Sequence, residues 1–160
     1  MRVLGVDPGY DRVGLAVLEY QNQAEILHYS TCIETERTHT LPDRIKQVGE
    51  AVHQCITEYA ADTLAIETLF FNKNVKTATS VAEARGVIIY VAKTLDCQVY
   101  EFSPQAIKIA TTGHGASDKA AVIKMVKQLV PAVPETALDD EYDAIAVGIT
   151  CLAEHGRQPQ

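Results

Sequence analysis

The first third of the chain alternates between apolar runs and short polar breaks, a pattern typical of β-strands. Three runs rich in Val, Leu, Ile and Tyr are separated by Pro8-Gly9 and by a polar stretch at residues 21–23, both of which favour turns. We expect strands at residues 2–6, 12–20 and 25–33. Because strands joined by short turns pair with each other, these three form an antiparallel meander.

Helical periodicity begins after Thr40, a residue suited to the N-cap, and apolar positions then recur at steps of three and four over residues 41–59. The rest of the chain predicts, in order, a strand at 63–67, a helix at 75–94, a strand at 98–102, a short helix after Pro104, a helix capped by Ser117 and a last helix at 139–154. The order βββαβαβ followed by helices predicts an α/β fold with a mixed five-stranded sheet flanked by helices. We assign residues 1–155 to one domain and 156–160 to a short polar tail.

Composition narrows the class of protein. The chain has 160 residues, of which 47% are hydrophobic and 22% charged, as in ordinary globular proteins. No apolar run approaches the roughly 18 residues that cross a bilayer, and the first residues lack the apolar stretch of a signal peptide. The four cysteines lie far apart without a C-x-x-C pair, which argues against zinc sites and disulfide scaffolds. We therefore expect reduced thiols in a cytoplasmic protein without a membrane segment.

Charge is distributed unevenly along the chain. The net charge of −7 at first argues against a nucleic-acid partner. Residues 73–127, however, hold eight Lys and Arg against four acids, so this window carries +4 and the rest of the chain −11. A positively charged segment in the middle of the chain favours a surface that binds phosphate, although solvated helix faces would give the same count of charges.

Two carboxylates stand at predicted strand ends. Asp7 closes the first strand, and Pro8 after it excludes a helical conformation. Glu67 closes a strand expected to be buried on both faces, where an unpaired ionised carboxylate is very costly. Asp7 could instead cap its own turn, and Glu67 could pair with Arg85 or a nearby lysine. Metal coordination or catalysis is the competing interpretation for both.

A third group of acids, residues 139–143, opens the last predicted helix. Asp140 and Asp143 are spaced i, i+3 and project into the same volume. Asp139 and Asp143, spaced i, i+4, do so equally well, so spacing does not choose between them. Acids also stabilise a helix N-terminus by about 0.3–1 kcal/mol each, which accounts for Asp139 and Glu141 better than for Asp143.

Acids that converge from separate segments need a cation to be stable together. Mg²⁺, with Mn²⁺ as a substitute, is the natural choice because both take oxygen ligands and keep waters for substrate phosphates. Two such ions about 3.5–4 Å apart activate a water and stabilise the leaving oxygen of a phosphodiester. Chemistry of this kind needs neither a histidine nor a cysteine nucleophile.

Several short motifs together resemble the RuvC family of Holliday junction resolvases. They are Gly5-Val6-Asp7-Pro8-Gly9, Ala65-Ile66-Glu67 and the run from Asp140 to Ala146, supported by residues 72–74, 83–86 and 113–115. Each motif is weak alone, but their order, spacing and extent over nearly the whole chain are specific. The resemblance implies a ribonuclease-H-like fold and a DNA endonuclease of recombination and repair. It makes Asp7, Glu67, Asp140 and Asp143 the catalytic acids, which bind one or two Mg²⁺ ions per subunit, and it favours Asp140 over Asp139.

The residues expected to bind DNA follow Glu67 or belong to the positively charged segment at residues 73–127. One extended strand cannot turn both Phe70 and Phe71 into a core, so one ring is available to stack on a base, although two core rings in a bend are equally compatible. The resemblance favours Phe70 for DNA, and it places Lys108 and a catalytic Lys119 near the scissile phosphate. We assign further DNA contacts to Lys73, Lys76 and Arg85.

The glycine-rich loop at residues 112–117 leads into a helix start, where N–H groups can meet a phosphate. It does not match the G-x-x-x-x-G-K-[ST] pattern of nucleotide hydrolases. We interpret His114 as a loop residue, with proton transfer as the alternative.

The resemblance also implies an assembly. Two symmetric cuts in a four-way DNA junction require a homodimer, and the family works with the RuvA–RuvB branch-migration complex. The apolar helix segment at residues 87–91 is our candidate for the dimer interface, with core packing as the alternative. Two other functions compete: an actin-like ATPase, which shares the strand order but needs a second copy of the domain, and a non-catalytic junction-binding module, which would lack the acids.

Overall fold

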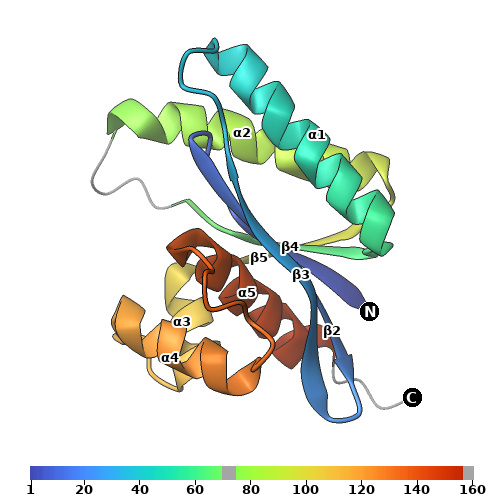
Figure 1. Ribbon diagram of the computed structural model, residues 1–160, viewed down its shortest axis with the longest axis vertical. Helices are drawn as coiled ribbons and strands as arrows, with labels where there is room; N and C mark the ends of the chain where they lie inside the picture. Colours follow the sequence, from blue (N-terminus) through green and yellow to red (C-terminus); the bar gives the residue numbers. More distant parts are fainter. Residues whose placement is uncertain (70–74, 157–160) are drawn as a thin grey trace.

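The computed structural model describes residues 1–69 and 75–156 as a mixed sheet covered by helices on both faces (Figure 1). The strand order is β3-β2-β1-β4-β5. Neighbours are antiparallel from β3 to β1 and parallel from β1 to β5. The predicted α/β fold is therefore confirmed, and the strands are β1 (Arg2–Asp7), β2 (Arg12–Gln21), β3 (Ala24–Glu34), β4 (Thr63–Glu67) and β5 (Gln98–Phe102).

The helices form two layers. One face of the sheet carries α1 (Leu41–Tyr59) and α2 (Val75–Thr94). The other face carries α3 (Pro104–Thr112), α4 (Lys119–Leu129) and α5 (Asp139–Cys151), the last followed by a π-helical turn, Leu152–Gly156. Predicted bounds agree closely, and α1 has its predicted N-cap, since the hydroxyl of Thr40 accepts a hydrogen bond from the N–H of Asp43.

The prediction that Ser117 caps the following helix is wrong. The α4 helix begins one residue later, and the carboxylate of Asp118 accepts a 2.8 Å hydrogen bond from the N–H of Ala121. The hydroxyl of Ser117 is engaged instead with the hydroxyl of Thr112, at 2.7 Å. Asp118 fills the N-cap because its carboxylate also complements the positive end of the helix dipole.

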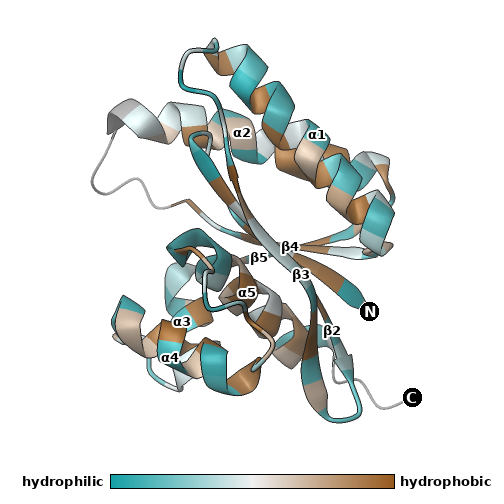
Figure 2. Cartoon of the chain, in the orientation of Figure 1, coloured by the Kyte–Doolittle hydropathy of each residue, from teal (hydrophilic) through white to brown (hydrophobic). Residues whose placement is uncertain are grey.

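Side chains of the strands alternate between two hydrophobic cores, one under each helix layer. In β1, Leu4 and Val6 pack toward α1 and α2, whereas Val3 packs toward α5. In Figure 2 the central strands are brown, while α1 alternates brown and teal along its length, as expected of a helix with one buried face. The alternation places Asp7, two residues beyond Gly5, on the face that α5 covers.

The α5 helix lies against β1 and β2 at backbone distance. A Cβ atom added to Gly5 would overlap the carbonyl oxygen of Ala144, and one added to Gly14 would overlap the carbonyl oxygen of Asp140. Only glycine at these two strand positions lets the start of α5 approach the sheet this closely. The close approach sets the depth at which α5 delivers its acids.

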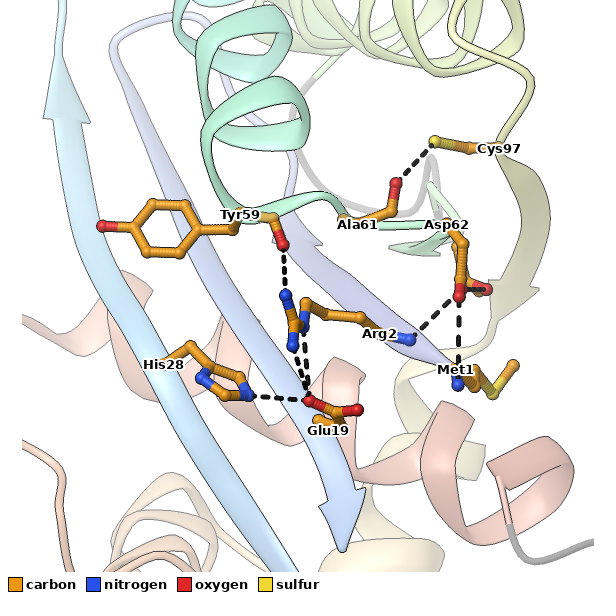
Figure 3. Close-up of polar contacts among 9 residues, drawn as sticks. Met1, Arg2, Glu19, His28, Tyr59, Ala61, Asp62 and Cys97 are labelled. Atoms are coloured by element: carbon orange, nitrogen blue, oxygen red, sulfur yellow. Dashed lines mark hydrogen bonds and ion pairs between the residues drawn. The ribbon is translucent and has the colours of Figure 1, made fainter.

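The opposite end of the sheet is closed by polar contacts around Arg2 (Figure 3). Its guanidinium donates a 2.8 Å hydrogen bond to the carbonyl of Tyr59 and pairs with Glu19 at 2.9 Å. Its backbone N–H donates to Asp62, which lies directly before β4. These contacts fix the connection between α1 and β4, and so the height of β4 beside β1.

The cysteines lie as expected for reduced thiols: Cys55, Cys97 and Cys151 are buried, Cys32 is half-buried, and all four are free. Within residues 1–69 and 75–156, none of the helices combines the length and the apolar character needed to span a membrane.

The close approach at Gly14 predicts a stability effect. Gly14→Ala must push α5 away from β2, and we expect it to lower the free energy of unfolding by at least about 2 kcal/mol. The control is Gly86→Ala on α2, where, apart from its chain neighbours and its own helix backbone, no atom of the described residues lies within 4 Å of the added Cβ. Gly86→Ala should raise stability by about 0.5–1 kcal/mol, because alanine is the better helix former. Urea unfolding of both variants tests this, and equal losses at the two sites would contradict it.

Candidate active site

The sheet brings Asp7 and Glu67 together. Strands β1 and β4 are parallel neighbours in which Val6 pairs with Ile66, so the residues that follow emerge side by side at one edge of the sheet. Alternation turns both side chains toward α5, because Val3 and Ala65 of the same strands also pack on that side. The predicted position of Asp7 at the end of the first strand is confirmed.

The start of α5 supplies Asp140 and Asp143. Burial, followed by the charges of Asp143, Glu67 and Asp140 in that order, raises the pKa of Asp7 to about 8, against an opposing effect of Lys119. The four predicted acids therefore lie within electrostatic reach of one another. We call Asp7, Glu67, Asp140 and Asp143 the acidic cluster.

The pKa values of Glu67 and Asp143, two other members of the acidic cluster, are raised as well. Burial, then the charge of Asp143, raises the pKa of Glu67 to about 7, and the charge of Lys108 opposes this rise. Burial raises the pKa of Asp143 as well, against the effect of Lys119. Carboxylates held in this way bind protons or cations readily, since either removes the repulsion between them.

Two cations pair with the cluster. The ammonium of Lys119 lies 3.0 Å from Asp143 and 3.3 Å from Asp139, and the guanidinium of Arg12 pairs with Asp140. Lys119 is a predicted site residue, whereas sequence reasoning missed Arg12. The side chain of Asp139 is 66% exposed, whereas that of Asp140 is 22% exposed.

Glu141 stabilises the start of α5 and is not a member of the acidic cluster. Its buried carboxylate accepts hydrogen bonds from the hydroxyl of Ser30 at 2.8 Å and from the N–H of Leu138 at 3.0 Å. Leu138 is the N-cap residue of α5 and has no side-chain acceptor, so Glu141 performs part of that task. The contact with Ser30 ties the start of α5 to β3.

The turn after Asp7 is held by Arg44 of α1. The buried guanidinium donates a 2.9 Å hydrogen bond to the hydroxyl of Thr35, pairs with Asp11, and lies 4.9 Å from the ring centre of Tyr10. Thr35 in turn donates its backbone N–H to the carbonyl of Asp11 at 3.0 Å. These contacts fix the chain between Asp7 and Arg12, and nothing in the local sequence pattern pointed to Arg44.

A pocket of about 210 Å³ opens beside the cluster, between α3, α4 and α5. Glu67 and Asp143 form its acidic side, Lys108 and Lys119 its basic side, and Ile107 and Val122 part of its apolar wall. Both lysines predicted to lie near a scissile phosphate thus share one cavity with two of the acids.

Arg85 approaches Glu67, but at the backbone. Its guanidinium donates a 3.1 Å hydrogen bond to the carbonyl of Glu67 and pairs with Glu101 of β5. It thereby secures the end of β4, and its contact with DNA stays a prediction.

The remaining predicted residues fall in two groups. Phe70, Phe71 and Lys73 lie outside the described residues, and the side chain of Lys76 is not described either. His114 lies in the loop after α3, where its Nδ1 accepts a hydrogen bond from the N–H of Ala116.

Known proteins resemble this chain over nearly its whole length. The model of the family described as crossover junction endodeoxyribonuclease RuvC matches residues 3–151. The chain belongs to the RuvC family. It is 42% identical over 150 residues to the RuvC protein of Finegoldia magna, which covers 93% of this chain and 91% of that protein. It is also 42% identical to the RuvC protein of Thermosipho melanesiensis, with 98% and 99% covered.

Solved structures of RuvC share the fold. The Thermus thermophilus RuvC structure superposes with a TM-score of 0.88 at 25% identity, covering 98% of this chain and 97% of that chain. The same protein in complex with a Holliday junction substrate superposes with a TM-score of 0.86, covering 94% and 92%. The predicted ribonuclease-H-like fold is thus confirmed.

The donor set of the cluster fits a hard divalent cation. Four carboxylates offer oxygen ligands, and binding of a cation would relieve the repulsion that raises the pKa of Asp7 and Glu67. Within the residues that the structure describes, no three acidic, histidine or cysteine side chains already form a complete ligand set. Two of the four acids are paired with Arg12 and Lys119 instead.

The raised pKa of Asp7 predicts a pH dependence of stability in the absence of metal. In the folded protein the carboxyl of Asp7 keeps its proton up to about pH 8, whereas in the unfolded chain it loses the proton near pH 4. The contribution of Asp7 to the free energy of unfolding therefore declines as the pH rises between these values. Asn at this position does not titrate. In EDTA, Asp7→Asn should therefore melt several degrees above the parent protein at pH 8.5, and this difference in melting temperature should shrink toward pH 4.5.

Thermal melts across this pH range measure the effect. The control is Glu83→Gln, which removes an exposed carboxylate of α2, on the face of the sheet opposite α5. A gap of the same size in Glu83→Gln, or one that widens at low pH, would contradict the assignment to Asp7.

Proposed function

We propose that this RuvC-family protein is a Mg²⁺-dependent endonuclease that resolves four-way DNA junctions. The observation that carries the proposal is the acidic cluster: carboxylates from β4 and α5 act electrostatically on Asp7 of β1 at one edge of the sheet, in a chain about 40% identical to RuvC proteins over nearly its whole length. The relatives bear the name crossover junction endodeoxyribonuclease.

The residues have distinct tasks. Asp7, Glu67, Asp140 and Asp143 would hold one or two Mg²⁺ ions, with Mn²⁺ as a substitute. Bound there, the metal supplies Lewis acidity and lowers the pKa of a coordinated water. Lys119 and Lys108 bring positive charge to the pocket shared with the acids, which suits them to bind the scissile phosphate.

The proposal extends to the substrate and the assembly. The T. thermophilus RuvC structure with a Holliday junction substrate supports a four-way junction as the ligand. We further propose that the protein acts in the cytoplasm as a homodimer, with RuvA–RuvB as partner. In α2, Ile88 is fully buried whereas Tyr90 is 69% exposed, so core packing accounts for Ile88 and leaves Tyr90 for an interface. Phe70, Lys73, Lys76 and Arg85 remain proposed DNA contacts.

The first experiment tests metal and acids together. A synthetic four-way junction should be cut with Mg²⁺ and bound without cutting when Ca²⁺ replaces it. Asp7→Asn, Glu67→Gln, Asp140→Asn and Asp143→Asn should each abolish cutting while binding persists, because removing negative charge beside phosphates does not weaken affinity. Asp139→Asn is the control and should cut normally.

Its outcomes separate the candidate functions. Binding without cutting under every metal would indicate a non-catalytic junction-binding module. ATP binding by the purified protein would favour the actin-like ATPase. Normal cutting by Asp140→Asn together with an inactive Asp139→Asn would move the metal ligand by one residue.

A second experiment separates Lys119 from the rest of α4. Because Lys119 contacts Asp143 in the pocket, Lys119→Ala should lower the single-turnover cutting rate about 10²-fold, more than it lowers junction affinity. Lys124, exposed on the same helix, is the matched control, and Lys124→Ala should change either quantity little. Equal losses of affinity at both positions, with no separate loss of rate, would reduce Lys119 to part of a basic surface.

A further inference from the structure

Arg12 reaches the acidic cluster from the sheet. It is the first residue of β2, and it lies two positions before Gly14, on the same face of the strand. The start of α5 covers this face at Gly14, since a Cβ there would overlap the carbonyl of Asp140. The alternation of side chains along β2 thus points Arg12 toward Asp140, whose carbonyl lies against Gly14.

Arg12 contacts two carboxylates, and its side chain also hydrogen-bonds the thiol of Cys32. Its Nη2 pairs with Oδ2 of Asp140, and its Nε lies 3.8 Å from Oε1 of Glu34, the residue opposite it in the β2–β3 ladder. The side chain of Asp140 is 22% exposed, that of Arg12 40% and that of Glu34 65%. The tighter and more sheltered contact is the one with Asp140.

This pairing occupies an oxygen that a metal would need. Asp140 belongs to the proposed ligands, yet the described residues contain no complete ligand set, and Asp140 is turned to a guanidinium instead. A guanidinium and a divalent cation cannot both hold the same carboxylate oxygen at full strength, since their charges repel each other.

We infer that Arg12 is a resident counter-ion of the metal site: a positioning residue that holds Asp140 when no metal is bound and competes with the divalent cation for it. Arg12 keeps the carboxylate in place at the start of α5 and lowers the affinity of the site for the ion. The inference rests on the proposed function, because it takes Asp140 as a metal ligand.

Metal binding without DNA tests the inference directly. Calorimetric titration with Mn²⁺ should show Arg12→Gln binding about two- to fivefold more tightly than the parent, the range expected for the loss of a partly exposed ion pair. Arg12→Lys keeps a competing charge and should stay near the parent value. Arg37→Gln removes one exposed positive charge without touching Asp140, and it measures the long-range effect of charge alone.

Glu34→Gln tests the same contact in the opposite direction. Glu34 is largely exposed, so its replacement leaves the fold intact even if Arg12→Gln proves unstable. Without Glu34, Asp140 is the one acidic partner that Arg12 keeps among the described residues, beside the thiol of Cys32. Mn²⁺ should then bind more weakly than in the control Glu36→Gln, which removes an exposed acid nearby.

Two readings overturn the inference. One is an affinity of Arg12→Gln for Mn²⁺ that equals or falls below those of the parent and Arg37→Gln. The other is equal affinity in Glu34→Gln and Glu36→Gln. A parent protein that cuts junctions with Mg²⁺ while either reading holds refutes only the role of Arg12, whereas a parent that neither binds Mn²⁺ nor cuts refutes the proposed function itself.

Discussion

The approach of α5 to β1 and β2 at backbone distance is the contact on which the site depends. Gly5 and Gly14 remove the two Cβ atoms that would hold the helix off the sheet. As a result, the first turn of α5 delivers Asp140 and Asp143 to the strand end that carries Asp7. A helix held farther out would leave these carboxylates in solvent, without the coupling that raises the pKa of Asp7.

Gathering four acids has an electrostatic cost that the protein meets in several ways. Arg12 and Lys119 each pair with one acid, and the raised pKa values of Asp7 and Glu67 reduce the charge of the other two near neutral pH. The surrounding structure also restrains the chain, because Arg44 fixes the turn after Asp7 and Arg85 secures the end of β4. The site is thus held by contacts from both sides of the sheet.

Sequence reasoning recovered the fold because its signals are local. Alternating apolar residues with turn signals defined the meander, and steps of three and four defined α1 to the residue. Asp7 and Glu67 were identifiable as strand ends, and parallel pairing of their strands then brings them together. The Ser117 cap failed because serine and aspartate are adjacent and both suit the position, so the choice depended on a contact with Thr112.

Residues joined only in three dimensions were not predictable in this way. Arg12 and Asp140 are separated by most of the chain, as are Ser30 and Glu141, and no periodic pattern relates them. Arg44 looks like any charged residue of an amphipathic helix until the fold brings the Asp7 turn against it. The choice of Asp140 over Asp139 came from the family resemblance, since spacing alone left both possible.

The hydrogen bond between Ser30 and Glu141 has a consequence for how this site changes over evolutionary time. A buried carboxylate tolerates the loss of a hydrogen-bond donor poorly, whereas a serine beside a small residue loses little. Substitutions at these two positions are therefore linked in order: Glu141 can be replaced first, and Ser30 only afterwards or at the same time. Related proteins should therefore change at both positions together. Those with glutamate at the position of Glu141 should keep a hydrogen-bond donor at the position of Ser30 in β3.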